Sequence, residues 1–272
     1  MKNRLQARIQ KVTRSRSKLF CAFLTLGYPN LDATARLIEA FENEGVDIIE
    51  LGFPFSDPLA DGPTIQFSSE RALAKGVHVK DAFRVVRGLR RRGCRIPILF
   101  FSYLNPILHY GFKKFLAHAK SSGFDGLIIP DLPPEEELAL QKECRRLDLT
   151  LSFLIAPTTE KRRAATIAHR SRGFVYYVSV RGVTGARQSL PGDIKRHLRL
   201  LRRISGKPFL VGFGVSSSEQ AKALSRMSEG VIVGSVLIDH LRRSGGKIDS
   251  TVRFVREMIR SVKGKNGGAA RA

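Results

Sequence analysis

Two carboxylates in the first quarter of the chain have the residue type and setting that chemistry requires. Glu50 lies near the end of an apolar run, V-D-I-I-E-L (46–51), and Asp61 follows in a loop stiffened by three prolines. A carboxylate at the exit of a buried strand costs free energy unless it is paired, solvated from a cleft or held with a raised pKa. One carboxylate on a rigid strand and another on a stiff loop suit general acid/base catalysis. The competing interpretation is that Glu50 pairs with a basic neighbour and Asp61 caps a turn.

Glycine-rich segments in the last third of the chain form a second candidate site. They read S-V-R-G-V-T-G-A-R (179–187), G-F-G-V-S-S-S (212–218) and G-S-V-L-I-D-H (234–240). Glycine lets backbone N–H groups approach phosphate oxygens, and a helix N-terminus favours an anion. The G-F-G motif lacks the third glycine of a dinucleotide fingerprint. Any tight turn can use glycine, so the joint placement of the segments, more than each motif alone, predicts phosphate binding.

The elements that must position these residues alternate regularly. Eight short apolar strands alternate with eight amphipathic helical segments, a pattern typical of parallel βα units. Eight units in 272 residues predict a closed (β/α)8 TIM barrel, which needs roughly 250 residues, over an open Rossmann-like sheet. Strands are expected at 18–26, 46–51, 96–102, 125–130, 150–155, 174–178, 208–212 and 230–233. Helices are expected at 31–44, 64–92 (a pair broken at Gly76), 111–122, 134–147, 160–171, 192–203, 216–228 and 247–263.

The chain shows no linker, so we expect one barrel domain over residues 1–263 and a disordered tail over 264–272. Residues 1–17 carry apolar side chains at helical spacing and predict an additional amphipathic helix over one end of the barrel. Active sites of such barrels lie at the carboxyl ends of the strands, with phosphate after the last strands. Glu50 ends the second expected strand, and the glycine segments follow the sixth, seventh and eighth. The barrel therefore favours the catalytic interpretation.

Composition limits the classes of protein and of site. No run of about 18 uncharged apolar residues is present, and the N-terminus lacks the apolar core of a secretory signal. The three cysteines are far apart and predict reduced thiols in a cytoplasmic protein. The six histidines show no ligand spacing, so no metal is expected.

The net charge of +23 comes from 47 basic and 24 acidic residues. The basic residues gather in segments 84–95, 161–172 and 195–207, which otherwise resemble surface helices. A nucleic-acid surface is one interpretation, although no aromatic residues interleave with the arginines. We favour solvated helix faces whose positive field attracts an anionic phosphate substrate.

The segment E-L-G-F-P-F-S-D-P-L-A-D-G-P-T-I-Q (50–66) resembles the signature of the tryptophan synthase α chain. Further similar segments are T-L-G-Y-P (25–29), Y-L-N-P (103–106), P-D-L-P (130–133), Y-Y-V-S-V-R-G-V-T-G-A-R (176–187), V-G-F-G-V-S (211–216) and V-G-S (233–235). The resemblance covers almost the whole chain. One departure is Arg181, where the family usually has a small or hydroxylated residue.

The resemblance implies a lyase that cleaves indole-3-glycerol phosphate to indole and glyceraldehyde 3-phosphate in tryptophan biosynthesis. It implies that Glu50 is the acid/base group and that Asp61 accepts a hydrogen bond from the indole N–H. Tyr176 matches a tyrosine near the catalytic glutamate, although core packing is an equal alternative. Thr184 matches a lid residue that hydrogen-bonds the Asp61 loop.

Substrate-binding residues follow from the same resemblance. The phosphate is expected on backbone N–H groups of Gly185, Gly214, Gly234 and Ser235. The indole pocket is expected to be lined by Phe23, Phe101, Leu127 and Ile155, each of which could instead be barrel core.

The family's partner is a pyridoxal-phosphate-dependent β chain, which implies an αββα heterotetramer and no cofactor in this chain. The expected contact residues are Asp57, Pro58, Tyr103 and Asn105. Other phosphate-binding barrels compete with this interpretation, but a synthase would need a strand-end lysine and an epimerase would need metal ligands. A barrel that binds or regulates a partner without turnover is a further alternative, against which the intact Glu50 and Asp61 speak.

Overall fold

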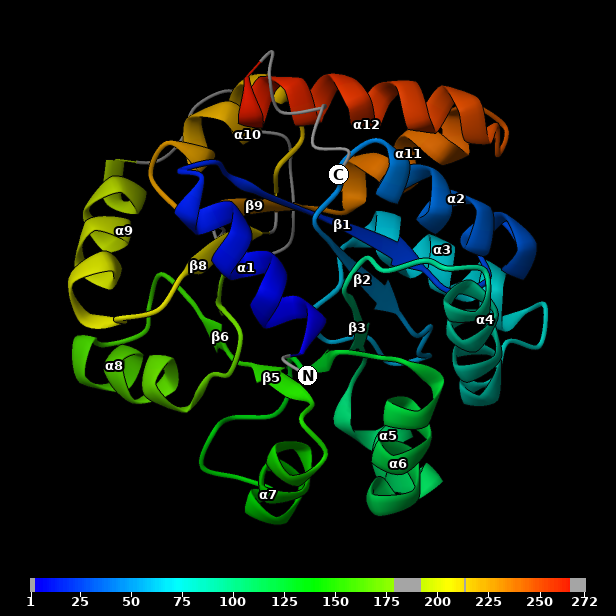
Figure 1. Cartoon of the computed structure of the whole chain (residues 1–272), viewed down its shortest axis with the longest axis horizontal. Helices are drawn as coiled ribbons and strands as arrows, with labels where there is room; N and C mark the ends of the chain where they lie inside the picture. The colour runs from blue at the N-terminus through cyan, green and yellow to red at the C-terminus, as the bar shows by residue number, and fades with distance from the viewer. Residues whose placement is uncertain (1–2, 179–191, 213, 265–272) are drawn as a thin grey trace.

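A computed structural model describes residues 3–178, 192–212 and 214–264. Strands and helices alternate around a ring (Figure 1). The strands are β1 (Leu19–Thr25), β2 (Ile48–Gly52), β3 (Ile98–Phe101), β4 (Gly126–Ile128), β5 (Thr150–Ser152), β6 (Leu154–Ile155), β7 (Val175–Val178), β8 (Phe209–Gly212) and β9 (Gly230–Val233). The helices are α1 (Arg4–Arg14), α2 (Leu31–Asn43), α3 (Pro63–Leu73), α4 (Val79–Arg91), α5 (Leu104–Tyr110), α6 (Phe112–Ser122), α7 (Leu138–Arg146), α8 (Lys161–Arg170), α9 (Gly192–Ile204), α10 (Ser218–Ser225), α11 (Ser235–Arg243) and α12 (Ile248–Lys263).

All strand pairs are parallel, in the order β5-β4-β3-β2-β1-β9-β8-β7-β6. The two ends of this order, β5 and β6, are consecutive in the chain and separated only by Phe153. The carbonyl oxygen of Phe153 accepts a hydrogen bond from the N–H of Tyr176 at 3.0 Å, so the segment joins β4 to β7 as one strand. The sheet is therefore a closed TIM barrel with eight strand positions, which confirms the predicted fold class.

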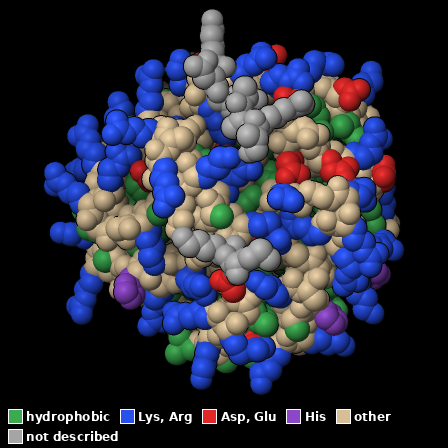
Figure 2. All heavy atoms as spheres, in the orientation of Figure 1, with side chains coloured by type: hydrophobic (Ala, Val, Ile, Leu, Met, Phe, Trp, Pro, Cys, Tyr) green, Lys and Arg blue, Asp and Glu red, His purple; other side chains and the backbone are tan. Residues whose placement is uncertain are grey.

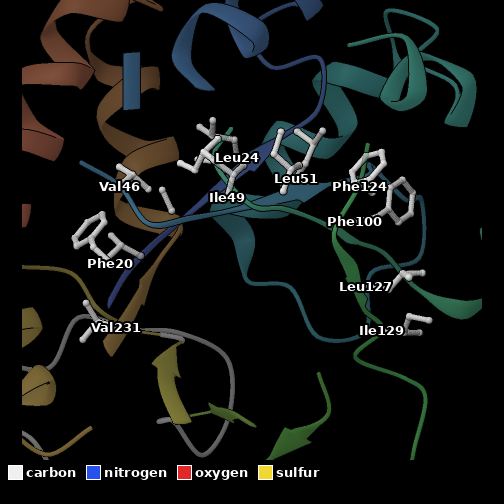
Figure 3. Close-up of a cluster of buried hydrophobic side chains, with 14 of the residues drawn as sticks. Phe20, Leu24, Val46, Ile49, Leu51, Phe100, Phe124, Leu127, Ile129 and Val231 are labelled. Carbon is white, nitrogen blue, oxygen red and sulfur yellow. The ribbon is translucent and has the colours of Figure 1, made fainter. Parts of the chain in front are cut away.

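Alternation along each strand separates two apolar clusters. The outer cluster fills the layer between the sheet and the helices and includes Phe20, Ile49, Phe100 and Leu127 (Figure 3). The inner cluster fills the inside of the barrel. Its members are strand residues next in sequence to those of the outer cluster, such as Cys21, Ile48, Leu99 and Ile128. Glu50 therefore shares the inward face of β2 with Ile48 and Gly52.

Helix α1 closes the amino end of the barrel, as expected. Its apolar residues Leu5, Ile9 and Val12 belong to the inner cluster, and Figure 1 shows α1 lying across the ring of strands. The side chain of Asn3 accepts from the N–H of Leu5 at 2.9 Å, which caps the helix. The same side chain donates to the carbonyl oxygen of Asp125 at 2.8 Å, which fixes the helix to the start of β4.

The buried carboxylates at this amino end are all paired. Asp125 contacts the guanidinium groups of Arg4 and Arg90, both at 2.9 Å, and accepts from the N–H of Ile98. Asp47 contacts Lys263 at 2.5 Å and accepts from the N–H of Phe20. Loss of either partner would leave an uncompensated charge in the interior, which is strongly destabilising.

Two details of the fold differ from the sequence-based expectation. The predicted strand at 150–155 is divided at Phe153 into β5 and β6. The segment after β3 forms the short helix α5, which is not among the expected helices. Pro106 lies in the first turn of α5, where a missing N–H costs no helical hydrogen bond. Of the tail expected at 264–272, residues 265–272 lie outside the described residues.

Lysine and arginine side chains spread over the face of the molecule shown in Figure 2. Several pair with acids one turn away on the same helix, such as Arg84 with Asp81 on α4 at 2.7 Å. This arrangement fits solvated helix faces. No helix of the described residues is long and apolar enough to cross a membrane.

Candidate active site

A cavity with about 530 Å³ of empty space, including the part open to solvent, lies at the carboxyl ends of the strands. It brings together the two carboxylates, an aromatic wall and the glycine loops that lie far apart in the sequence. The lining residues are Phe23, Glu50, Asp61, Gly62, Ile65, Phe101, Tyr176, Gly214, Val215, Ile232, Gly234 and Ser235.

Glu50 is held rigidly because β2 lies between β1 and β3, with Glu50 in register with Phe23 and Leu99. Its side chain is 1% exposed. Unlike Asp47 and Asp125, it makes no ion pair with any residue that the structure describes. Burial raises its pKa to about 8, and a hydrogen bond from Cys21 opposes part of that rise. Glu50 can therefore carry a proton near neutral pH and release it, as an acid/base group must.

The oxygens of Glu50 differ in their surroundings. The thiol of Cys21 on β1 donates to Oε1 at a sulfur–oxygen distance of 3.5 Å. Oε2 is buried and has no hydrogen-bond partner within the described part of the chain. A buried oxygen without a partner is costly, and such atoms call for a functional explanation.

Asp61 enters the cavity from the loop after β2. Burial raises its pKa to about 6, and a hydrogen bond from the Tyr103 hydroxyl counteracts part of the effect. The same hydroxyl accepts from the N–H of Ala60 at 2.9 Å. The side chain of Gln66 on α3 makes a third hydrogen bond to this loop, in which it donates to the carbonyl oxygen of Asp61 at 2.8 Å. The loop is therefore held by hydrogen bonds as well as by its prolines.

An aromatic pair forms one wall of the cavity. Phe23 on β1 and Phe101 on β3 meet edge to face, with ring centroids 5.4 Å apart and an interplanar angle of 86°. The ring of Phe23 lies against Gly52, where an added Cβ would be only 2.3 Å from the ring carbon Cζ. Glycine at the end of β2 thus makes room for this ring beside Glu50. A flat apolar ligand would pack well against such a wall.

Another part of the cavity lining has the properties of an anion site. Gly214 follows β8 with φ of 76°, and Gly234 precedes α11, which begins at Ser235. The first N–H groups of a helix lack intrahelical acceptors and point out of its N-terminus, where they can bind an anion. Gly214, Gly234 and Ser235 all line the cavity. The expected residues Thr184 and Gly185 lie outside the described residues.

Tyr176 on β7 also lines the cavity, 3% exposed. Burial, followed by the charge of Glu50, raises the pKa of its phenol, so it stays neutral. Its ring lies against Gly212, where an added Cβ would be 2.6 Å from the hydroxyl oxygen. The structure therefore places this tyrosine near Glu50, as expected.

Two of the four expected indole-pocket residues do not line the cavity. Leu127 and Ile155 belong to the outer cluster, and Figure 3 shows Leu127 beside Ile129 in that layer. The reason is register: Leu127 pairs with Phe100, which also faces outward, whereas Ile128 pairs with the inward Phe101. That prediction was wrong for these residues, because a strand that is apolar on both faces does not reveal which face is inside.

Three apolar lining residues were missed. They are Ile65 on α3, Val215 after β8 and Ile232 on β9. Ile232 is in the inner cluster near the end of its strand, and alternation from a known inward residue would have found it. Ile65 lies in the first turn of α3 and Val215 in the loop after β8, and strand alternation gives no signal for either position.

The four expected partner-contact residues divide between surface and interior. Asp57 and Asn105 are exposed and Pro58 is half-buried. Leu59 beside them is 90% exposed, an unusual position for a large apolar side chain. Tyr103 is 3% exposed, so its side chain is committed to the Asp61 loop and unavailable to a partner. That expectation was wrong for Tyr103.

Within the described residues, no three His, Cys, Asp or Glu side chains are grouped as metal ligands would be.

Comparison with known proteins adds independent evidence. The family model described as "Tryptophan synthase alpha chain" matches residues 9–266. This chain belongs to the tryptophan synthase alpha chain family. It is 40% identical to the alpha chain of Caldanaerobacter subterraneus, over 96% of this chain and 98% of the relative. It is 43% identical to that of Shouchella clausii, over 89% and 87%.

Solved structures agree with the alpha chain assignment. The tryptophan synthase alpha chain of Legionella pneumophila superposes with a TM-score of 0.88 at 32% identity, covering 96% of this chain and 98% of that one. An aminoacrylate-bound tryptophan synthase from M. tuberculosis gives 0.86 at 31% identity, covering 96% and 100%. The chain is accordingly the lyase subunit that cleaves indole-3-glycerol phosphate in tryptophan biosynthesis. An alpha chain of this family has a beta chain as its partner.

Proposed function

We propose that Glu50 carries the proton transfers of indole-3-glycerol phosphate cleavage. Protonated Glu50 gives its proton to indole C3, which makes a cationic indolenine. The resulting carboxylate takes the proton of the hydroxyl on the adjoining side-chain carbon, that carbon becomes an aldehyde, and its bond to C3 breaks. The electron pair returns to the ring and neutralises its nitrogen. Glu50 ends the cycle protonated, so the one residue is acid and then base.

The observation that carries this proposal is the contrast between Glu50 and the structural carboxylates. Asp47 and Asp125 are buried with cations and backbone donors, whereas Glu50 is buried at the cavity wall with one oxygen that lacks a partner among the described residues. A carboxyl group in such a setting keeps its proton near neutral pH.

Asp61 would accept a hydrogen bond from the indole N–H. Its negative charge stabilises the positive charge that develops on the ring nitrogen when C3 is protonated, which lowers the barrier. Tyr103 and Ala60 hold the loop so that the carboxylate is already oriented. Asp61 must be ionised for this role, whereas Glu50 must begin protonated. The two carboxyl groups therefore need different environments.

The two ends of the substrate fit the aromatic and the glycine-rich parts of the cavity lining. Phe23 and Phe101 would contact the indole ring, while the N–H groups of Gly214, Gly234 and Ser235 would bind the phosphate. Tyr176 would pack beside Glu50 at the reacting carbon. Thr184 and Gly185 are proposed for a lid and for the phosphate site on the basis of the family resemblance. All the chemistry is proton transfer, so this half-reaction requires no cofactor in this chain.

We propose an αββα heterotetramer in which indole passes to a pyridoxal-phosphate-dependent β chain. The exposed Asp57 and Leu59 lie on the loop after β2, with Pro58 between them, and the exposed Asn105 lies in the first turn of α5; these residues are the proposed contact. The free thiols of the three buried cysteines suit the reducing cytoplasm, where we place the enzyme.

The decisive experiment measures indole release from indole-3-glycerol phosphate with and without the cognate β chain. We expect slow turnover alone, a large increase with the β chain, and co-elution of the two chains at micromolar concentration. Glu50→Gln should fold and bind substrate but lose about 10²–10⁴-fold in turnover. A folded Glu50→Gln enzyme with normal turnover would remove Glu50 from the mechanism. Fast turnover alone, without any effect of the β chain, would contradict the partnership.

A further inference from the structure

The carboxyl group of Glu50 is asymmetric, and the asymmetry comes from a neighbouring strand. Cys21 and Glu50 both face the barrel interior, Cys21 from β1 and Glu50 from β2. The thiol donates to Oε1, while Oε2 has no partner among the described residues. Cys21 is fully buried, and burial followed by the charge of Glu50 raises its pKa well above the ordinary value. The thiol therefore keeps its proton and remains a donor.

We propose that Cys21 is a positioning residue that selects Oε2 as the oxygen carrying the transferable proton of Glu50. Oε1 accepts the S–H hydrogen bond and so serves as the carbonyl-like oxygen of the protonated carboxyl group. The acidic proton then resides on Oε2, which is free to engage a ligand in the cavity. After transfer, the same oxygen is the basic one, because the thiol still occupies Oε1. This inference rests on the role of Glu50 proposed above.

Among the described groups around Glu50, the Cys21 thiol is the one that distinguishes its two oxygens. Within the described residues, the titratable groups beside Glu50 or lining its cavity are the Cys21 thiol from β1, the Tyr176 phenol from β7 and the Asp61 carboxyl group from the loop after β2. The other described neighbours on the inner face are apolar: Phe23 on β1, Leu99 on β3, Leu210 on β8 and Ile232 on β9. An apolar residue in place of Cys21 would leave the two oxygens of Glu50 nearly equivalent on the β1 side.

The chain offers a matched set of variants. Cys21→Ala and Cys21→Val remove the donor, with smaller and larger side chains, and Cys21→Ser retains a donor. Cys144→Ala is the control, since Cys144 is an equally buried thiol (1% exposed) in the outer cluster, away from the cavity. Thermal unfolding of each variant shows whether it is folded.

The test measures kcat, KM and the pH dependence of kcat/KM for indole-3-glycerol phosphate cleavage. We expect Cys21→Ala and Cys21→Val to lower kcat about three- to tenfold, the factor that corresponds to one ordinary hydrogen bond, with KM unchanged. Their alkaline limb should move to higher pH by about 0.5, since the lost donor stabilised the ionised carboxylate. Cys21→Ser and Cys144→Ala should stay within about twofold of the wild type, an effect smaller than that of one hydrogen bond. Unchanged profiles in Cys21→Ala, or equal changes in Cys144→Ala, would overturn the proposal.

A second measurement separates this inference from the mechanism on which it rests. The carboxyl carbon of Glu50 can be titrated by NMR in protein labelled with ¹³C-glutamate, with its resonance assigned from Glu50→Gln. The pKa of Glu50 should be higher in Cys21→Ala than in the wild type and not in Cys144→Ala. If Glu50→Gln retained turnover, the mechanism would fail, while this titration would still decide whether the thiol acts on Glu50. An identical titration in the wild type and Cys21→Ala would contradict the inference by itself.

Discussion

The hydroxyl of Tyr103 hydrogen-bonds the carboxyl group of Asp61 and, at 2.9 Å, accepts from the N–H of the preceding residue, Ala60. Tyr103, which follows β3, therefore holds the loop that follows β2 in place. Burial followed by the charge of Asp61 raises the pKa of Tyr103, so the phenol remains a donor throughout the working range. Asp61 is thereby presented to the cavity in a fixed orientation.

Replacing Tyr103 with phenylalanine should loosen this loop. We expect kcat/KM for indole-3-glycerol phosphate to fall about tenfold, because one donor to a charged group is lost. The acidic limb of the pH profile should move upward, since the Tyr103 hydrogen bond lowers the pKa of Asp61. Tyr110→Phe is the control: its hydroxyl hydrogen-bonds His118 at 2.7 Å, outside the cavity lining. Equal effects of the two variants would show that Tyr103 acts only through stability.

The dependence of kcat/KM on pH should be bell-shaped. Activity rises as Asp61 ionises with a pKa of about 6 and falls as Glu50 loses its proton with a pKa of about 8. The maximum is expected between these values. The substrate phosphate also titrates near about 6, so Asp61→Asn is needed to identify the acidic limb. A profile that keeps rising above pH 8 would show that Glu50 acts from its ionised form.

Stability should depend on pH through Glu50. Its pKa is raised from 4.5 to about 8 in the folded protein, so between these values the native state holds a proton that the unfolded chain has lost. The free energy of unfolding contributed by this group therefore falls as pH rises through that window, by at most about 1.4 kcal/mol per pH unit. Urea unfolding at several pH values should show Glu50→Gln becoming more stable than the wild type toward pH 8. Asp57→Asn, at an exposed carboxylate, should run parallel to the wild type.

Gly214→Val should weaken phosphate binding. The glycine has φ of 76° at the cavity wall, where a branched side chain is strained and blocks the N–H groups. We expect KM to rise about tenfold or more with a smaller change in kcat, as for a lost ground-state contact. Gly206→Val is the control for backbone strain, because Gly206 has φ of 57° with no atom within 4 Å of an added Cβ. If KM rose equally in both variants, the glycine would matter only for folding.

The sequence by itself determined the alternating elements, the barrel and the position of Glu50. These follow from local patterns: short apolar runs, amphipathic helices and a carboxylate where a strand ends. The division of β2 into two faces, with Glu50 beside Ile48 and Gly52, also followed from alternation alone.

Only the tertiary structure decided which face of each strand lines the cavity and which distant residues meet. Leu127 and Ile155 lie outside the barrel because strand register, set by neighbouring strands, orients them there. Tyr103 reaches Asp61, and Cys21 reaches Glu50, because parallel strands place their carboxyl ends together. A strand that is apolar on both faces carries no mark of its inner side, and a hydrogen bond between separate strands leaves no local pattern. These contacts arise only when the barrel closes.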